Sequence, residues 1–135
     1  MDVYKIMNIG ASALLAQRKR MEVLSSNLAN LHTTRTPQGG PYRRRDVVFQ
    51  AEPVEGEAMG VKVVGIVEDR RRPFRVVYDP GHPDADENGY VRLPNVNLME
   101  EMVNMVLATR SYEAALKVIS TAEEMALRTI DILGR

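Results

Sequence analysis

The polar stretch DPGHPDADENGY is the part of the sequence whose residue types and spacing most suggest chemistry. Within it, Asp84, Asp86, Asn88 and Gly89 match D-x-D-x-N-G, the first half of an EF-hand calcium loop. A complete loop needs a bidentate glutamate at its twelfth position, which is Asn95 in this chain, and its ninth position carries an arginine. The residues on both sides are typical of strands rather than of the helices that flank an EF-hand. We therefore predict a turn-rich connection between strands, with no metal bound.

No other group of residues forms a catalytic or metal-binding pattern in the sequence. The chain has no cysteine, which excludes thiol nucleophiles, disulfides and zinc–thiolate sites. His32 and His82 are the only histidines, and neither has metal-ligand spacing to another histidine, so both are expected to be exposed in loops. The sequence contains neither a nucleophile elbow nor a phosphate-binding loop. We predict that the protein is not an enzyme and uses no cofactor.

Two runs of arginine, Arg43–Arg45 and Arg70–Arg72, leave two interpretations open. They could bind an anionic group such as phosphate, a membrane headgroup or an acidic partner, or they could form a solvated loop face. The chain has 18 basic and 18 acidic residues, and this balance argues against nucleic acid as a partner, because phosphate binding needs a basic surface. One functional hypothesis is therefore a monomeric binding module that recognises a ligand through the arginine runs or the Asp-rich loop.

The elements that must position these loops are two long helices, one at each end of the chain. Residues 3–31 contain no proline, and residues 98–133 contain neither proline nor glycine. Read in alternating steps of four and three, both segments repeat apolar residues in the manner of a coiled-coil seam. We predict that the seams pair the two helices and also provide an assembly interface. The predicted interface residues are Leu14, Met21, Leu24, Leu28, Leu31, Met102, Met105, Tyr112, Leu116, Ile119, Ile130 and Leu133.

The C-terminal helix carries boundary signals and one charge on its seam. Asn97 is a suitable N-cap, and Glu100 and Glu101 fall in the first turn, where acidic side chains interact favourably with the helix dipole. Glu123 falls on the predicted seam, where a charge costs stability unless it is paired or lies at the rim. Gln17 is the milder polar interruption of the N-terminal seam.

The middle of the chain, residues 32–96, holds all seven prolines and most of the glycines, a composition that breaks helices. Three segments there predict strands, at 60–69, 73–79 and 89–93. The predicted fold class is α+β, with long N- and C-terminal helices in a coiled-coil-like pair and a small β-rich insert. Residues 1–31 and 97–135 are expected to form a helical assembly domain, and 32–96 an inserted segment.

Both ends of the chain resemble the bacterial flagellar rod and hook proteins, a family of axial structural components. The sequence SSNLANLHTTRTPQGGPYRRRDVVF, residues 25–49, is similar to the N-terminal signature of that family, and residues 97–135 are similar to its C-terminal signature. The residues that carry the resemblance are Asn27, Leu28, Ala29, Asn30, Thr33, Glu101, Met102, Arg110, Tyr112, Glu113 and Ala114.

The resemblance extends over nearly the whole chain and implies a structural subunit of the proximal rod. Such subunits polymerise helically into the drive shaft between the membrane ring and the hook, across the periplasm, with the terminal helices in the inner tube and the insert outside. The implied partners are copies of itself, other rod subunits, the protein at the junction of rod and membrane ring, and the flagellar type III export apparatus. The resemblance also implies export without a cleaved signal peptide, which agrees with the lack of a signal-peptide pattern in the first residues. No run approaches the ~18 apolar residues of a membrane span.

Overall fold

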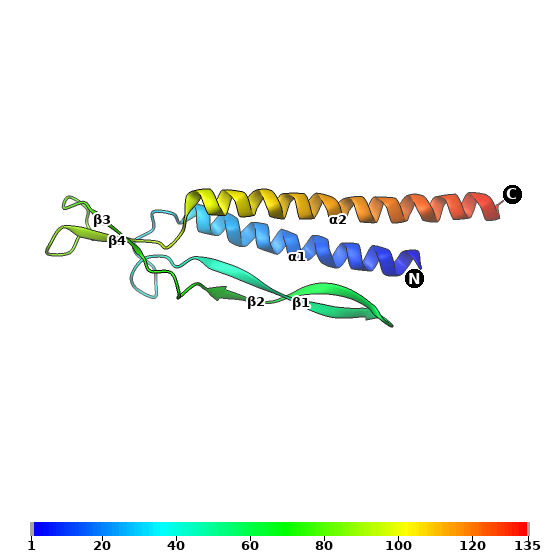
Figure 1. Ribbon diagram of the computed structural model, residues 1–135, viewed down its shortest axis with the longest axis horizontal. Coiled ribbons are helices and arrows are strands. Elements are labelled where there is room, and N and C mark those ends of the chain that lie inside the picture. Colours follow the sequence, from blue (N-terminus) through cyan, green and yellow to red (C-terminus); the bar gives the residue numbers. More distant parts are fainter. Residues whose placement is uncertain (1, 135) are drawn as a thin grey trace.

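Two long antiparallel helices run side by side along most of the molecule (Figure 1). The computed structural model describes residues 2–134, with α1 over Val3–Ala29 and α2 over Leu98–Leu133. The strands between them are β1 (Arg45–Glu55), β2 (Ala58–Glu68), β3 (Arg75–Tyr78) and β4 (Tyr90–Leu93). This arrangement confirms the predicted α+β class, with paired terminal helices and a small β-rich insert. In the described chain, neither helix has a stretch that is long and apolar enough to cross a membrane.

The helices begin at side chains that cap their first turns. The Asn97 side chain accepts a hydrogen bond from the backbone N–H of Glu100 at 3.0 Å, as the sequence predicts for α2. Asp2 does the same for α1, accepting from the backbone N–H of Lys5 at 2.9 Å. Each cap satisfies one of the backbone donors that a helix N-terminus leaves without an internal partner.

The strands form two separate antiparallel hairpins. The β1–β2 hairpin is long and has register shifts after Val48 and after Pro53, whereas the β3–β4 hairpin is short. The predicted strands at 60–69, 73–79 and 89–93 correspond to β2, β3 and β4. The sequence pattern does not indicate β1, because polar residues and a proline interrupt its apolar run.

α1 is packed on two sides, against α2 and against the β1–β2 hairpin (Figure 1). Gly10 faces α2, since a Cβ atom there would lie 2.8 Å from Ile119 Cγ1. On the other side, the Ser12 hydroxyl accepts a hydrogen bond from the backbone N–H of Val61 at 3.1 Å, and a Cβ atom on Gly60 would lie 2.7 Å from that hydroxyl. These two glycines therefore permit the close approach of α1 to both neighbours.

The face of α2 that packs on α1 is narrow and is made mainly of small residues. Ala108, Ala115 and Ala122 recur at intervals of seven residues, and each is at most 5% exposed. Every second position of the predicted α2 seam, such as Leu116 and Glu123, is displaced from this stripe by one residue, whereas Met105, Tyr112 and Ile119 are half-buried. Glu123, for example, is exposed beside the buried Ala122 instead of lying in the contact. Gly10 makes room for the branched side chains of Ile119 and Val118, whereas the most buried apolar positions of α2 are alanines.

Candidate assembly surfaces

A buried cluster of polar side chains joins the C-terminal end of α1 to the N-terminal end of α2. It is termed the polar node and consists of Asn27, Tyr42, Arg44, Asn95 and Glu101. All five are at most 8% exposed, and Asn27 and Glu101 are fully buried. Each group needs a partner, because a buried polar group without one costs about 1–3 kcal/mol.

Asn27 is the centre of the polar node. Its side-chain nitrogen donates to the carbonyl oxygen of Arg45 at 2.8 Å and to Glu101 Oε2 at 3.1 Å. Its Oδ1 accepts hydrogen bonds from the Tyr42 hydroxyl at 2.8 Å and from the backbone N–H of Arg45 at 3.0 Å. One amide group thus fixes α1, α2 and the start of β1 relative to one another, with both of its polar atoms satisfied.

The polar node contains a buried ion pair between Arg44 and Glu101. Arg44 Nε donates to Glu101 Oε1, and Arg44 Nη1 lies 3.4 Å from Asp46 Oδ2. Burial by itself would lower the pKa of Arg44, but the hydrogen bonds and negative charges of Glu101 and Asp46 outweigh burial and raise that pKa. The guanidinium therefore stays charged in the interior, and its stability depends on the carboxylate beside it.

Asn95 extends the polar node to the segment that leaves β2. Its Oδ1 accepts a hydrogen bond from the backbone N–H of Arg44 at 2.7 Å. Its side-chain nitrogen donates to the carbonyl oxygens of Asp69 at 2.9 Å and Arg72 at 3.2 Å. Asn95 stands where an EF-hand would have its twelfth-position glutamate. In this fold it has a structural role instead, because it holds its own segment against Arg44 and against the segment from Asp69 to Arg72.

The other polar residues of the N-terminal signature close the turn after α1. Asn30 donates through its side-chain nitrogen to the carbonyl oxygen of Ser26 at 2.9 Å, and its Oδ1 accepts from the Thr33 hydroxyl at 3.0 Å. The carbonyl oxygen of Thr33 then accepts from the backbone N–H of Tyr42 at 3.0 Å. These bonds close the turn at the end of α1 and direct the chain towards the polar node. The signature residues Asn30 and Thr33 therefore have a structural role.

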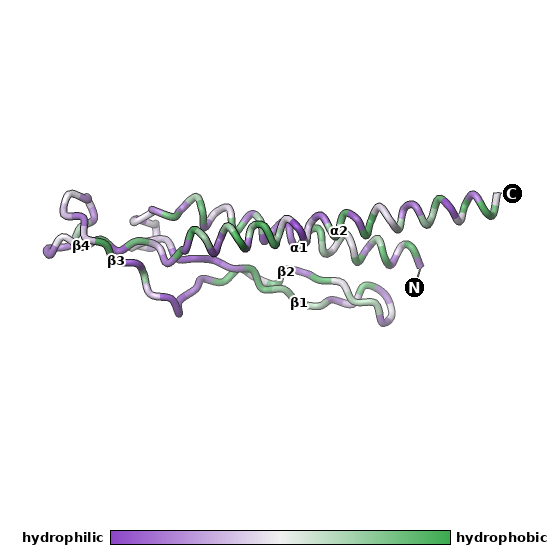
Figure 2. Tube along the Cα trace, turned by 45° about the horizontal axis from the view of Figure 1, so that its top comes forward, coloured by the Kyte–Doolittle hydropathy of each residue, from purple (hydrophilic) through white to green (hydrophobic). Residues whose placement is uncertain are grey.

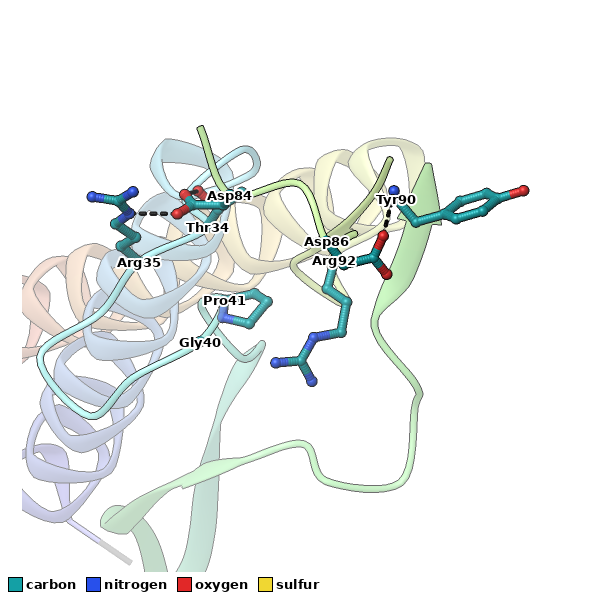
Figure 3. A pocket seen from close by; sticks show the side chains of 8 residues that line it. All are labelled: Thr34, Arg35, Gly40, Pro41, Asp84, Asp86, Tyr90 and Arg92. Carbon is teal, nitrogen blue, oxygen red and sulfur yellow. Dashed lines mark hydrogen bonds and ion pairs between the residues drawn. The ribbon is translucent and has the colours of Figure 1, made fainter. Parts of the chain in front are cut away.

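The Asp-rich loop is held closed by hydrogen bonds from the chain itself (Figure 3). Asp84 accepts from the Thr34 hydroxyl at 2.6 Å and from Arg35 Nε, and these two donors lower the pKa of Asp84. Asp86 Oδ1 accepts from the backbone N–H of Tyr90 at 2.9 Å. Both carboxylates therefore serve the turns that connect β3 to β4, and Asp84 also ties this connection to the segment after α1.

His82 differs from the sequence expectation because it is half-buried rather than exposed, whereas His32 is exposed as expected. The ring nitrogen Nδ1 of His82 accepts a hydrogen bond from the backbone N–H of Asp84 at 2.9 Å. This contact explains its partial burial, because the imidazole folds back onto its own loop.

The first arginine run makes contacts within the chain rather than a solvated face. Arg43 lies over the Phe74 ring with 4.4 Å between the guanidinium carbon and the ring centroid, and Arg45 lies over Tyr42 at 5.4 Å. Both are cation–π contacts. Arg44, between them, belongs to the polar node, so the sequence interpretation missed its burial. The three adjacent arginines thus have three different environments.

The second arginine run is anchored to the first turn of α2. Arg72 forms two hydrogen bonds of 2.7 Å with Glu100. The hydrogen bonds from Arg72 lower the pKa of Glu100, although burial opposes them. Arg70 pairs with Glu68 at 3.0 Å on the surface. This run therefore holds the segment after β2 against the beginning of α2.

We expect acid to weaken the Arg72–Glu100 contact. The folded-state pKa of Glu100 is lowered, so its contribution is present above the ordinary value of 4.5 and is lost as pH falls through the folded value. An exposed pair of this kind contributes about 0–1 kcal/mol.

The Glu100→Gln variant should therefore lose less stability than the parent between about pH 5 and pH 3. The urea midpoint at each pH, followed by far-UV circular dichroism, measures the effect. Glu87→Gln is the control, because Glu87 is exposed and forms no ion pair within residues 2–134. Equal pH slopes for parent and Glu100→Gln would contradict this prediction.

The side of α2 away from α1 carries exposed apolar residues, termed the outer stripe. Its members are Met99, Met102, Val103, Val106 and Leu107, which line one shallow hollow and are 49–70% exposed. Contiguous exposed apolar surface marks sites of interaction with other molecules. The outer stripe is therefore a candidate surface for a neighbouring subunit.

The predicted interface residues divide into two groups. Leu24 is 2% exposed, and a further set is half-buried. The half-buried residues are Leu14, Met21, Leu28, Leu31, Met105, Tyr112 and Ile119. Met102, Leu116, Ile130 and Leu133 are 44–80% exposed, so much of their surface is not covered by α1. A role for either group between subunits stays a prediction.

The C-terminal signature divides in the same way. Glu101 belongs to the polar node and Tyr112 is half-buried. The signature residues that are exposed on α2 are Met102, Arg110, Glu113 and Ala114. One part of the signature therefore holds the fold together, and the other part faces outward.

α2 is longer than α1 and projects beyond it (Figure 1). The Asn27–Glu101 hydrogen bond and the position of Gly10 against Val118 and Ile119 show the register of the antiparallel pair. This register places the first residue of α1 opposite position 125, so residues 127–133 have no partner in α1. Figure 2 shows apolar positions alternating with polar ones up to this free end. The apolar residues of this overhang are Leu127, Ile130, Ile132 and Leu133, which are 61–80% exposed.

Comparisons with known proteins match both helical ends of the chain. A family described as Flagella basal body rod protein matches residues 7–35, and a family described as Flagellar basal body rod FlgEFG protein C-terminal matches residues 87–132. These ranges cover most of α1 with the turn after it, and most of α2. The fold and the buried signature residues thus define the class of flagellar basal-body rod proteins.

Individual relatives match over nearly the full length. The flagellar basal-body rod protein FlgC of Salmonella typhimurium is 46% identical over 133 residues, which is 98% of each chain. FlgC of Borreliella burgdorferi is 40% identical and FlgC of Bacillus subtilis is 41% identical, each over 98% of this chain and 99% of the relative. The chain therefore belongs to the FlgC family of flagellar basal-body rod proteins, which are structural subunits of the rod.

Proposed function

We propose that this rod subunit polymerises helically in the proximal rod, as part of the drive shaft between the membrane ring and the hook. The outer stripe carries the proposal, because it is an apolar face of α2 that the described chain leaves exposed. Contacts between unlike surfaces of neighbouring subunits, when they do not close into a ring, build an open helical assembly.

The packing of α1 supports a division into inner and outer parts. The β1–β2 hairpin covers one side of the helix pair within the subunit, whereas the α2 side is open (Figure 1). Residues 1–31 and 97–135 accordingly form the inner, assembly domain, and residues 32–96 form the outer segment. In this arrangement the exposed apolar side chains of α2 face neighbouring helices rather than water.

The proposed partners are further copies of the chain, other rod subunits and the protein at the junction of rod and membrane ring. The flagellar type III export apparatus is the proposed route to the basal body, without a cleaved signal peptide, and the rod then crosses the periplasm. Membership of the FlgC family supports this placement.

Deleting the gene in the parent bacterium is expected to abolish motility and to leave basal bodies without a complete rod. Soft-agar swimming and electron microscopy of isolated basal bodies measure the two effects, and a plasmid copy of the gene should restore both. A motile deletion strain with intact rods contradicts the proposed function. It would favour the alternative of a monomeric binding module.

A further inference from the structure

We propose that a hollow at the open end of the β1–β2 hairpin binds an acidic segment of a partner protein, whose carboxylates contact Arg43 and Arg45. The hollow has a volume of about 280 Å³ and is termed the arginine hollow. Its charged and aromatic lining residues are Tyr42, Arg43, Arg45, Glu68 and Arg70. All of them lie in the inserted segment between α1 and α2, so the inference goes beyond the proposed polymerisation and does not depend on it.

Two of these arginines carry charges that the chain does not compensate. Within residues 2–134, neither Arg43 nor Arg45 forms an ion pair. Glu68, the carboxylate that lines the hollow, is paired with Arg70 at 3.0 Å. Three arginines therefore face one glutamate, which leaves a net charge of +2 around the hollow. A concave surface of one sign attracts groups of the opposite sign.

Aromatic rings hold both unpaired arginines in place. Arg43 lies over the Phe74 ring, and Arg45 lies over the Tyr42 ring. Tyr42 is 6% exposed and its hydroxyl donates to Asn27 Oδ1, so the polar node fixes the ring beneath Arg45. Stacking occupies the face of a guanidinium and leaves the N–H groups at its edge free to donate. Such side chains lose little further freedom when an anionic group binds them.

A second cation beside Phe74 increases the positive charge behind the hollow. The guanidinium carbon of Arg92 lies 5.4 Å from the centroid of the ring that Arg43 also contacts. Figure 3 shows the Arg92 guanidinium pointing away from the Asp86 carboxylate, and Arg92 forms no ion pair in the described chain. Two like charges on one ring repel each other, and a carboxylate bound to Arg43 reduces that repulsion.

The chemistry of the hollow favours the carboxylates of a protein over a nucleic acid or a membrane. A guanidinium binds a carboxylate through two parallel hydrogen bonds, and clusters of arginine recognise acidic motifs in proteins. Nucleic acids and anionic membranes are continuous polyanions that need an extended basic surface. This chain balances 18 basic with 18 acidic residues, and Glu68 lies beside the three arginines. A local excess of positive charge therefore suits a short acidic segment.

Binding of a defined acidic peptide tests the site. The probe is a short fluorescein-labelled peptide of alternating glutamate and glycine, and fluorescence anisotropy follows its binding to the purified chain. Arg43→Gln/Arg45→Gln should weaken the affinity by roughly tenfold or more, because two charge-assisted contacts are lost. The matched control is Arg110→Gln/Arg128→Gln, which removes the same charge from exposed positions of α2 and should bind as the parent does.

Three outcomes of this measurement contradict the site. They are no binding of the peptide by the parent, equal weakening in the two double variants, and binding of inorganic phosphate or phosphatidylglycerol vesicles in place of the peptide. Equal urea midpoints of the parent and Arg43→Gln/Arg45→Gln show that the fold is intact. If the double variant is less stable, Arg45→Gln replaces it, because Arg45 is exposed, and that change should still weaken binding by about threefold.

Photocross-linking tests the same contact in the cell. A photoreactive phenylalanine analogue replaces Gln38, an exposed residue that lines the arginine hollow. In isolated basal bodies it should join the chain to a peptide rich in aspartate and glutamate, and Arg43→Gln/Arg45→Gln should abolish that product. A joined peptide without acidic residues overturns the inference. Motile cells whose double variant gives the same product also overturn it, and they leave the proposed function standing.

Discussion

Alanine in place of Glu101 is expected to lower the free energy of unfolding by about 3–5 kcal/mol, a large share of the 5–15 kcal/mol of an ordinary domain. The change leaves Arg44 buried with only Asp46 nearby, at 3.4 Å, and removes an acceptor from Asn27. The dominant cost is the uncompensated cation in the interior, not the loss of attraction. Urea denaturation of the purified chain, followed by far-UV circular dichroism, measures it.

A double variant separates the cost of an unpaired charge from the value of the pair. In Arg44→Met/Glu101→Leu both charges are replaced by apolar side chains, an exchange that is often neutral or stabilising for a buried pair. We expect the double variant to be more stable than Glu101→Ala. Asn27 retains its bonds to Tyr42 and to the backbone of Arg45 in that variant. A urea midpoint of Glu101→Ala equal to that of the parent would show that the ion pair is not structurally important.

An aspartate at Met102 is expected to prevent rod assembly while leaving the subunit folded. Met102 is 50% exposed on the outer stripe, so the carboxylate stays hydrated in the free chain and the stability should change by no more than about 0.5 kcal/mol. In the assembled rod the same carboxylate would enter an apolar contact without a partner. The expected phenotype is loss of motility with a normal urea midpoint.

Leu24→Asp is the matched substitution inside the helix pair. Leu24 is 2% exposed, so burying a carboxylate there should cost more than about 4 kcal/mol and should unfold the chain as well as abolish motility. The two variants thus distinguish folding from assembly, although both place aspartate at a predicted interface position. Normal rods in cells that carry Met102→Asp would contradict a role for the outer stripe.

The sequence predicted the helices of this protein better than it predicted their contact. Caps, proline placement and periodicity located α1 and α2 and identified Asn97 as the N-cap. Part of the seam was misplaced in α2, at positions such as Leu116 and Ile130, because large apolar residues were taken to mark the partner helix. In α2 they lie mainly on exposed surfaces, whereas the contact with α1 uses alanines such as Ala108 and Ala115. Hydrophobicity alone does not say whether a residue packs within its own chain or against a neighbour.

The polar node could not be assembled from the sequence for a different reason. Its bonds join residues that are distant in the chain, such as Arg44 with Asn95 and Asn27 with Glu101. No local pattern distinguishes Arg44 from the two arginines beside it. The resemblance to rod and hook proteins singled out Asn27 and Glu101, but it did not indicate that they touch. Only the fold brings them within hydrogen-bond distance.

The separation of Asn27 from Glu101 also determines when the subunit becomes rigid. Their hydrogen bond spans 74 positions, and α1 has no other helix to pair with in the described chain. A chain delivered from its N-terminus releases α1 first, and the helix pair cannot close until the segment from Leu98 to Ala122 has followed. Contacts of such long range form late, because the intervening loop must close before they contribute. The stiff, paired state of the helices therefore requires residues from both ends of the chain.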